Sequence, residues 1–89
     1  MERSVRVNYS ERFLKKLSRT SQRFIAEAEE KERVFKLNPF HPSLETHKLH
    51  GKDKDAWAFS INRKYRIKFI FLAEDAVLFL DLGTHDIYR

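Results

Sequence analysis

The sequence contains no cysteine, only two glycines and two prolines, and no long hydrophobic run. Without cysteine the chain has no disulfide, no thiolate nucleophile and no cysteine-ligated zinc site, as is typical of a cytosolic protein. No segment approaches the roughly 18 apolar residues of a membrane-spanning helix, and no apolar stretch typical of a secretory signal follows the first residues. We therefore expect a cytoplasmic globular protein that does not associate with a membrane.

The length of 89 residues predicts a single domain over residues 1–89. Hydrophobic residues make up 42% of the sequence, which is enough for one modest core and argues against intrinsic disorder. Lysine and arginine outnumber aspartate and glutamate by 18 to 13, so the net charge is +5. A basic balance favours a polyanionic or acidic partner, but it fits equally well a cationic surface that only aids solubility.

The hydrophobic pattern changes its period halfway along the chain. Residues 5–9 alternate as in a short strand, a short helix follows Ser10, and a second helix is predicted over 22–37. Asn38-Pro39 ends that helix, because proline disfavours helical geometry at the preceding residue. Later segments have a period of two and predict strands over 47–50, 56–62, 65–72 and 77–80. This order predicts an α+β domain in which two N-terminal helices pack on one face of a four-stranded, mainly antiparallel sheet.

Basic side chains gather on one face of the strand predicted over 65–72. Tyr65, Ile67 and Phe69 supply a core face, so Arg66 and Lys68 project together from the opposite face, roughly 7 Å apart. One face of an antiparallel sheet can remain in contact with water. Further cations stand nearby in the sequence: Lys48, Lys52, Lys54, Arg63 and Lys64. The cluster indicates contact with a phosphate backbone, and the alternative is an ordinary solvated strand face.

The C-terminal segment adds groups suited to RNA cleavage. His85 titrates near neutral pH, Tyr88 offers a phenol and a ring that stacks on a base, and Arg89 lies beside it. Cleavage within an RNA chain needs a base for the 2′-OH, an acid for the 5′-oxygen and a cation that stabilises the transition state. The alternative for a lone histidine in a tail is a surface residue with no chemical role.

Other polar groups leave their roles open. His47 and His50 would lie on opposite faces of a strand and have no cysteine or acidic cluster beside them, so we expect no metal and no cofactor. Asp81, inside an apolar run, is either a buried hydrogen-bonded group or the wet end of a strand. The acidic residues of the second helix are either a partner site or a solvated face with local ion pairs; they are Glu27, Glu29, Glu30 and Glu32.

Four stretches in succession resemble the RelE/ParE superfamily of toxins from bacterial and archaeal toxin–antitoxin modules. They read HKLHG (47–51), WAFSIN (57–62), YRI (65–67) and DLGTHDIYR (81–89). The resemblance implies two helices on a four-stranded antiparallel sheet and a cytosolic antitoxin in a hetero-oligomer. It also implies one of two activities. RelE-like members cleave mRNA in the ribosomal A site without a metal ion, whereas ParE-like members inhibit DNA gyrase and are not nucleases.

The same resemblance assigns roles to individual residues. The strand arginine of the family falls on Arg66, which would hold the scissile phosphate. The C-terminal basic or histidine position falls near His85, a candidate general acid, and the C-terminal tyrosine falls on Tyr88, which would stack on a base or assist proton transfer. The general base is not fixed by the pattern, and the candidates are Glu45, His47 and Lys48.

The favoured hypothesis is a toxin that acts as a metal-independent, ribosome-dependent mRNA endoribonuclease and so inhibits translation. Its catalytic residues are Arg66, His85 and Tyr88. Its RNA contacts are Lys48, Lys52, Lys54, Arg63, Lys64, Lys68 and Arg89. The alternatives are a ParE-like gyrase inhibitor and a degenerate module that retains only antitoxin binding. The charge predicts an acidic, partly disordered antitoxin segment that folds on binding and either covers the basic face or displaces the C-terminal tail.

Overall fold

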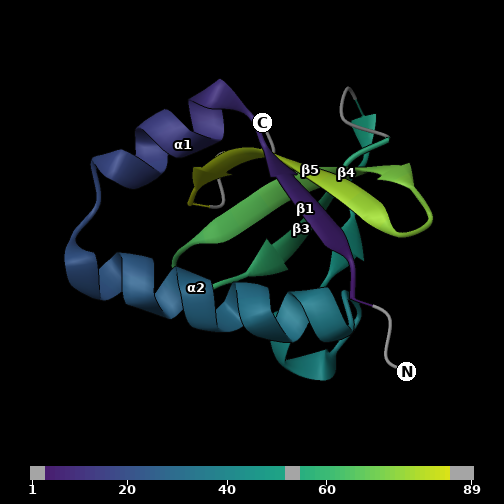
Figure 1. The fold of residues 1–89 in the computed structure, drawn as a ribbon, viewed down its shortest axis with the longest axis horizontal. Helices are drawn as coiled ribbons and strands as arrows, with labels where there is room; N and C mark the ends of the chain where they lie inside the picture. The colour runs from purple at the N-terminus through teal and green to yellow at the C-terminus, as the bar shows by residue number, and fades with distance from the viewer. Residues whose placement is uncertain (1–3, 52–54, 85–89) are drawn as a thin grey trace.

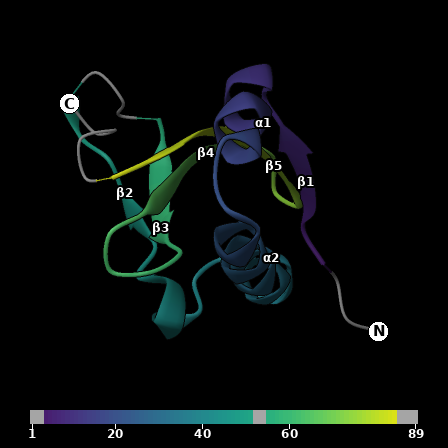
Figure 2. The same cartoon turned by 90° about the vertical axis from the view of Figure 1, so that its left-hand side faces the viewer.

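The computed structural model describes residues 4–51 and 55–84, which form two helices and a five-stranded sheet (Figure 1). The elements in chain order are β1 (Arg6–Tyr9), α1 (Glu11–Ser18), α2 (Gln22–Leu37), the 3₁₀ turn η1 (Pro42–Leu44), β2 (His47–Lys48), β3 (Trp57–Ser60), β4 (Arg66–Ala73) and β5 (Ala76–Gly83). The helices cover one face of the sheet (Figures 1 and 2), which confirms the predicted α+β layers. Neither helix among the described residues has the length and hydrophobicity that a membrane span requires.

The sheet is mixed, with the order β1-β5-β4-β3-β2, so the prediction of four mainly antiparallel strands is wrong in its count. The strands from β2 to β5 pair antiparallel in chain order. β1 joins the far edge and runs parallel to β5, with Val7 opposite Val77 and Tyr9 opposite Phe79. Alternation within a short segment predicts a strand but not its neighbour, because the pairing depends on contacts distant in the sequence.

Both helices begin at serine caps, as local sequence chemistry dictates. The hydroxyls of Ser10 and Ser21 accept hydrogen bonds from the backbone N–H groups of Phe13, at 3.0 Å, and Phe24, at 3.1 Å. The predicted bounds of α2 are confirmed, because the helix ends at Leu37 before the Asn-Pro pair. Ser10 also donates to the carbonyl of Leu80 at 2.8 Å, which ties the start of α1 to β5.

The hydrophobic core lies between the helices and the sheet. Phe35 of α2 is fully buried, and its ring centroid lies 4.6 Å from that of Phe59, 5.0 Å from Phe69 and 5.4 Å from Phe79. Ile67 and Phe69 of β4 belong to this core, so the helices cover the side of β4 that the alternation predicted. The intervening residues of β4 therefore point to the other face of the sheet.

Candidate nucleic-acid interface

The face of the sheet opposite the core residues Ile67 and Phe69, here called the site face, carries two cross-strand rows that include charged and polar residues. Residues directly opposite each other on paired strands share a face. The first row runs from β3 to β5 through Ser60, Arg66 and Gly83. The second row runs from β2 to β5 through His47, Ala58, Lys68 and Asp81. Arg66 and Lys68 thus lie on one face in neighbouring rows, as their spacing predicted.

Glu45 extends the first row. The Ser60 hydroxyl donates a hydrogen bond to Glu45 Oε1 over 3.2 Å, and Ser60 is only 5% exposed. Glu45 directly follows η1 and has a left-handed backbone with a φ of 51°. Because cross-strand neighbours have Cβ atoms about 5 Å apart, Arg66 lies on the other side of Ser60. Ser60 therefore contacts a carboxylate that can accept a proton, and its cross-strand neighbour Arg66 carries a guanidinium that can bind a phosphate.

Ser60 is a site residue that the sequence analysis missed. The signal was available in the hairpin, because Ser60 and Arg66 stand at equal distances from its tip at Arg63. A hairpin pairs residues symmetrically about its turn, so the position of the predicted arginine also identifies its neighbour on the preceding strand.

His47 places an imidazole on the same face. Its Nδ1 lies 3.0 Å from the backbone carbonyl oxygen of Glu45. A carbonyl oxygen only accepts hydrogen bonds, so Nδ1 is the donor in this contact. His47 is the cross-strand partner of Ala58, which in turn pairs with Lys68. The site face thus holds an imidazole one row away from Arg66.

The guanidinium of Arg66 is held at the turn between β3 and β4. Its Nη1 donates to the carbonyl oxygens of Asn62, at 2.9 Å, and of Arg63 and Tyr65, each at 3.3 Å. The side chain of Asn62 orders the same turn, because it accepts hydrogen bonds from the backbone N–H groups of Lys64 and Tyr65. Anchoring one nitrogen fixes the plane of the guanidinium, and a fixed planar fork suits two-point binding of a phosphate.

Asp81 is a buried hydrogen-bonded group, which decides between the two alternatives left by the sequence. It is 9% exposed and accepts a hydrogen bond from the backbone N–H of Leu82 at 2.8 Å. Its carboxylate also forms ion pairs with α1, at 2.6 Å from Lys16 Nζ and 3.7 Å from Arg12 Nη1. The β4–β5 pairing skips Leu80 next to it, since Lys68 is opposite Asp81 and Phe69 is opposite Phe79.

Lys48 does not join Arg66 and Lys68, contrary to the prediction. It pairs with Trp57, which pairs with the core residue Phe69, so its side chain is on the helix-bearing face of the sheet. Its Nζ lies 5.9 Å from the centroid of the Trp57 ring, within range of a cation–π contact. β2 has only two residues, and alternation over so short a strand did not reveal which of them faces the site.

The other predicted residues divide into two sets. Arg63 and Lys64 are exposed at the β3–β4 turn beside Arg66. Five lie outside the described residues: Lys52, Lys54, His85, Tyr88 and Arg89. Among residues 4–51 and 55–84, no group of three or more histidine, cysteine or acidic side chains is arranged to hold a metal ion.

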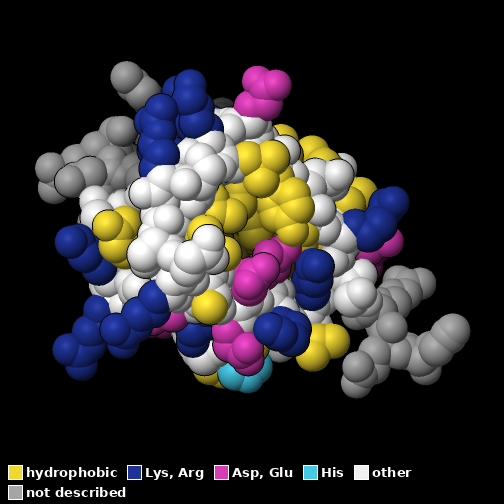
Figure 3. Space-filling view, turned by 60° about the vertical axis from the view of Figure 1, so that its left-hand side comes forward, with side chains coloured by type: hydrophobic (Ala, Val, Ile, Leu, Met, Phe, Trp, Pro, Cys, Tyr) yellow, Lys and Arg dark blue, Asp and Glu magenta, His cyan; other side chains and the backbone are white. Residues whose placement is uncertain are grey.

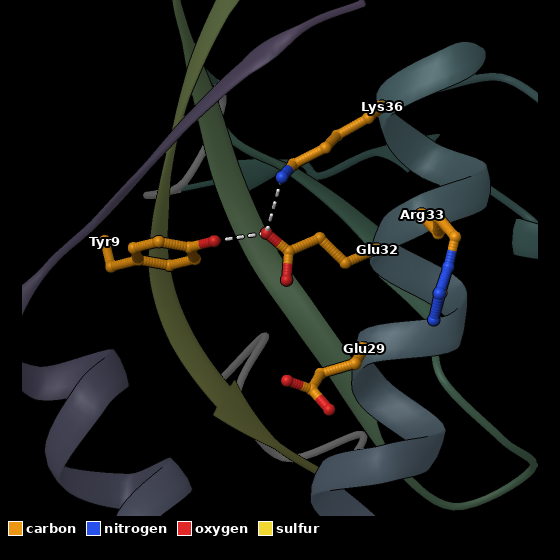
Figure 4. Close-up of a pocket in the computed structure, with 5 residues that line it drawn as sticks. All are labelled: Tyr9, Glu29, Glu32, Arg33 and Lys36. Atoms are coloured by element: carbon orange, nitrogen blue, oxygen red, sulfur yellow. Dashed lines mark hydrogen bonds and ion pairs between the residues drawn. The ribbon is translucent and has the colours of Figure 1, made fainter.

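A second polar cluster lies on the helix side, between β1 and α2 (Figure 4). It surrounds a hollow of about 440 Å³ lined by Tyr9, Glu29, Glu32, Arg33 and Lys36. The Tyr9 hydroxyl donates a hydrogen bond to Glu32, whose carboxylate lies 3.8 Å from Lys36 Nζ. Burial, and then the carboxylates of Glu32 and Glu29, raise the pKa of the Tyr9 phenol well above its usual value. A phenol held neutral is a donor, so the cluster joins β1 to α2 and favours the ion-pair interpretation of the acidic helix.

Comparison with solved structures finds the same fold in toxins of toxin–antitoxin systems. A YoeB/ParE toxin from Agrobacterium tumefaciens matches 91% of this chain and 99% of its own, with a TM-score of 0.76 and 15% identity. The archaeal RelE–RelB complex from Pyrococcus horikoshii matches 91% of this chain and 94% of its own, with a TM-score of 0.73 and 16% identity. The toxin–antitoxin complex RelBE2 from Mycobacterium tuberculosis matches 92% and 99%, with a TM-score of 0.77 and 14% identity. No protein-family model and no curated protein matches the chain. The fold is therefore that of RelE/ParE toxins, as the resemblance implied.

Proposed function

We propose that the protein is the toxin of a toxin–antitoxin module and that it cleaves mRNA on the ribosome without a metal ion. The observation that carries this proposal is the adjacency of Glu45, Ser60 and Arg66 on the site face. The likeness of fold supports the class of toxin. The row of residues supports the nuclease branch, because it offers a proton acceptor beside a phosphate ligand.

In the proposed reaction a base removes the proton of the ribose 2′-OH, and the 2′-oxygen attacks the adjacent phosphorus. The bond from phosphorus to the 5′-oxygen breaks, which leaves a 2′,3′-cyclic phosphate and a protonated 5′-hydroxyl. Arg66 binds the non-bridging oxygens and stabilises their growing charge, and Lys68 adds positive charge one row away. We propose that His85 protonates the leaving oxygen and that Tyr88 stacks on a base, as the resemblance to the family implies.

The geometry favours Glu45 as the general base among the three candidates. Lys48 is on the opposite face of the sheet, and His47 is in the row of Lys68 and not in that of Arg66. The Glu45 carboxylate contacts the hydroxyl of Ser60, the cross-strand neighbour of Arg66. A general base must lie within reach of the proton that it removes. Only Ser60 separates Glu45 from Arg66, the proposed phosphate-binding residue, so Glu45 suits this role best.

The proposal includes a partner and an organisation. A chain with a net charge of +5 and a basic site face attracts an acidic antitoxin segment. Two of the similar structures are a RelE–RelB complex and a toxin–antitoxin complex, which supports such a partner. We further propose that residues 1–89 act as one domain in the cytoplasm, with mRNA in the ribosomal A site as substrate.

Inducible expression with mapping of mRNA 5′ ends tests the proposal. The wild-type protein should arrest growth and create new 5′ ends within translated mRNA, and Arg66→Ala and Glu45→Gln should abolish both effects. Arg33→Ala removes an exposed cation from α2 and is the matched control, which should cleave like the wild type. Thermal melts of all three variants report whether each remains folded.

Two other outcomes would overturn the proposal that the protein is a nuclease. Growth arrest with intact mRNA and an induced DNA-damage response would identify a gyrase inhibitor. Normal growth, with the protein folded and expressed, would identify a module that retains only antitoxin binding.

A further inference from the structure

Four cations form a stripe along α1, here called the α1 stripe: Arg12, Lys15, Lys16 and Arg19. Their spacing of i, i+3, i+4 and i+7 puts all of them on one side of the helix. The apolar residues Phe13 and Leu17 pack into the core from the other side. The stripe is about 10 Å long at 1.5 Å per residue, and Arg12, Lys15 and Arg19 are exposed.

The α1 stripe keeps a net positive charge. Arg12 and Lys16 share the single carboxylate of Asp81. Lys15 and Arg19 form no ion pair with any residue in the described part of the chain. Asp81 thus holds two of the four cations, Arg12 and Lys16, while Lys15 and Arg19 are exposed to solvent. Figure 3 shows Lys and Arg side chains gathered at the upper left of the face in view, to one side of an apolar hollow.

The α1 stripe is continuous with the site face. A hollow of about 480 Å³ is lined by Glu11 and the four cations of the stripe. An adjoining hollow of about 350 Å³ is lined by Arg12 together with Lys68, Ser10, Leu80 and Asp81. Arg12 belongs to both, so it links the helix to the β4 cation in the row next to Arg66. A basic path therefore runs from Arg19 along α1, past Arg12, to Lys68.

We propose that this path binds the sugar-phosphate backbone of an RNA strand whose scissile phosphate lies at Arg66. The inference rests on the proposed function and extends it, because it assigns an RNA contact to a helix outside the sheet. The path follows discrete positive charges over a length that spans two to three phosphates of one strand. Its role is affinity and orientation, since contacts to phosphates carry no base information.

The charged surface around the α1 stripe favours a phosphate backbone over a protein interface with an apolar centre. Protein interfaces have a desolvated centre rich in aromatic and aliphatic side chains. The hollow along the stripe is lined by charged residues only, and the exposed Leu14 lies on the opposite side of α1. A ligand recognised there is recognised through charge, as a phosphodiester backbone is.

Equilibrium binding of a 20-nucleotide single-stranded RNA, measured against salt concentration, tests the path. The test variant is Lys15→Gln/Arg19→Gln, and the matched control is Lys31→Gln/Arg33→Gln on α2, which loses the same charge. All proteins carry Glu45→Gln so that the RNA stays intact. Loss of two phosphate contacts should weaken binding about 10- to 30-fold near 0.1 M salt and reduce the slope of log K against log [salt] by about 1.4. The control should bind within about twofold of its parent.

The outcomes separate this inference from the proposed function. Equal affinity and equal slope for the α1 variant and its parent would overturn the path, whatever the nuclease assay shows. Equal losses of RNA affinity in the variant and the control would mean that only net charge matters. That result would also overturn the proposed path. Unchanged RNA binding with weakened binding of poly-L-glutamate would reassign the stripe to an acidic protein. Absence of mRNA cleavage by the wild-type protein would overturn the proposed function. The comparison of RNA binding between the α1 variant and its control would remain valid.

Discussion

The hydroxyl of Ser60 donates a hydrogen bond to the carboxylate of Glu45 over 3.2 Å, across fifteen positions of the sequence. Glu45 makes this contact from a left-handed backbone with a φ of 51°. That conformation costs a residue with a Cβ about 1–2 kcal/mol, and strain of this kind concentrates at functional sites. Glu45 combines a strained backbone with a carboxylate. Substitutions at this position can therefore separate the effect of the strain from that of the carboxylate.

Glu45→Gly and Glu45→Gln should differ in stability but not in activity. Both lack the carboxylate, so both should lose mRNA cleavage by about 10²- to 10⁴-fold, the usual contribution of a general base. Glycine adopts a positive φ without strain, so Glu45→Gly should exceed Glu45→Gln in free energy of unfolding by about 0.5–1 kcal/mol. Urea unfolding measures the difference in stability, and cleavage of translated mRNA measures the shared loss of activity. A Glu45→Gly protein that cleaves like the wild type would remove Glu45 from the mechanism.

Asp81→Asn should destabilise the protein more than Asp75→Asn. Asp81 is nearly buried and holds Lys16 at 2.6 Å, so removal of its charge should lower the free energy of unfolding by about 1–3 kcal/mol. Asp75 pairs with Arg6 at 3.8 Å and both side chains are exposed, so its loss should change stability by no more than about 0.5 kcal/mol. Chemical denaturation of the two variants makes the comparison. Equal losses of stability in the two variants would mean that the ion pair of Asp81 does not stabilise the contact between α1 and β5.

Tyr9→Phe should remove a contribution to stability that the wild-type protein loses at alkaline pH. Burial raises the pKa of the Tyr9 phenol in the folded protein above its unfolded value near 10. The contribution of the neutral phenol is therefore complete below pH 10 and is lost as the pH rises from 10 toward the folded-state pKa. Near pH 7 the variant should lose about 0.5–1.5 kcal/mol through the missing hydrogen bond to Glu32.

Thermal melts of both proteins between pH 7 and pH 11 test the Tyr9 prediction. The difference in stability between wild type and Tyr9→Phe should stay constant to about pH 9.5 and shrink above pH 10. Groups other than Tyr9 titrate in both proteins, so the difference isolates this phenol. A difference that grows above pH 10 would show that the phenol ionises more readily in the folded state.

Local chemistry explains why some elements could be predicted and others could not. The bounds of α2 follow from two signals that act within a few residues, the Ser21 cap and the Asn-Pro stop. The site-face positions of Arg66 and Lys68 follow from strict alternation over a long strand. The parallel pairing of β1 with β5 and the face of Lys48 depend on partners distant in the sequence, and strands of four and two residues carry too little pattern to fix them.

The candidate site divides in the same way. Arg66 could be predicted from the sequence, and Glu45 was one of three candidate bases. That the two residues lie close together could not be predicted. Their proximity arises because η1 turns the chain so that Glu45 meets Ser60, and a left-handed residue at that point has no periodic signature. The cations of α1 had a clear signature at i, i+3, i+4 and i+7, but their continuity with Lys68 required the three-dimensional structure.

Arg66→Lys should separate charge from geometry at the phosphate. Lysine keeps the positive charge but not the planar fork, and it cannot reproduce the orientation that the carbonyl of Asn62 gives to Nη1. We therefore expect RNA affinity and its salt dependence to remain within about threefold of the wild type, because these follow charge. Cleavage should fall by about 10²- to 10³-fold, because the transition state loses an oriented donor pair. Arg23→Lys, at an exposed position of α2, is the matched control and should retain full cleavage. If Arg66→Lys cleaves as well as the control, positive charge alone suffices at this position and the guanidinium has no special role.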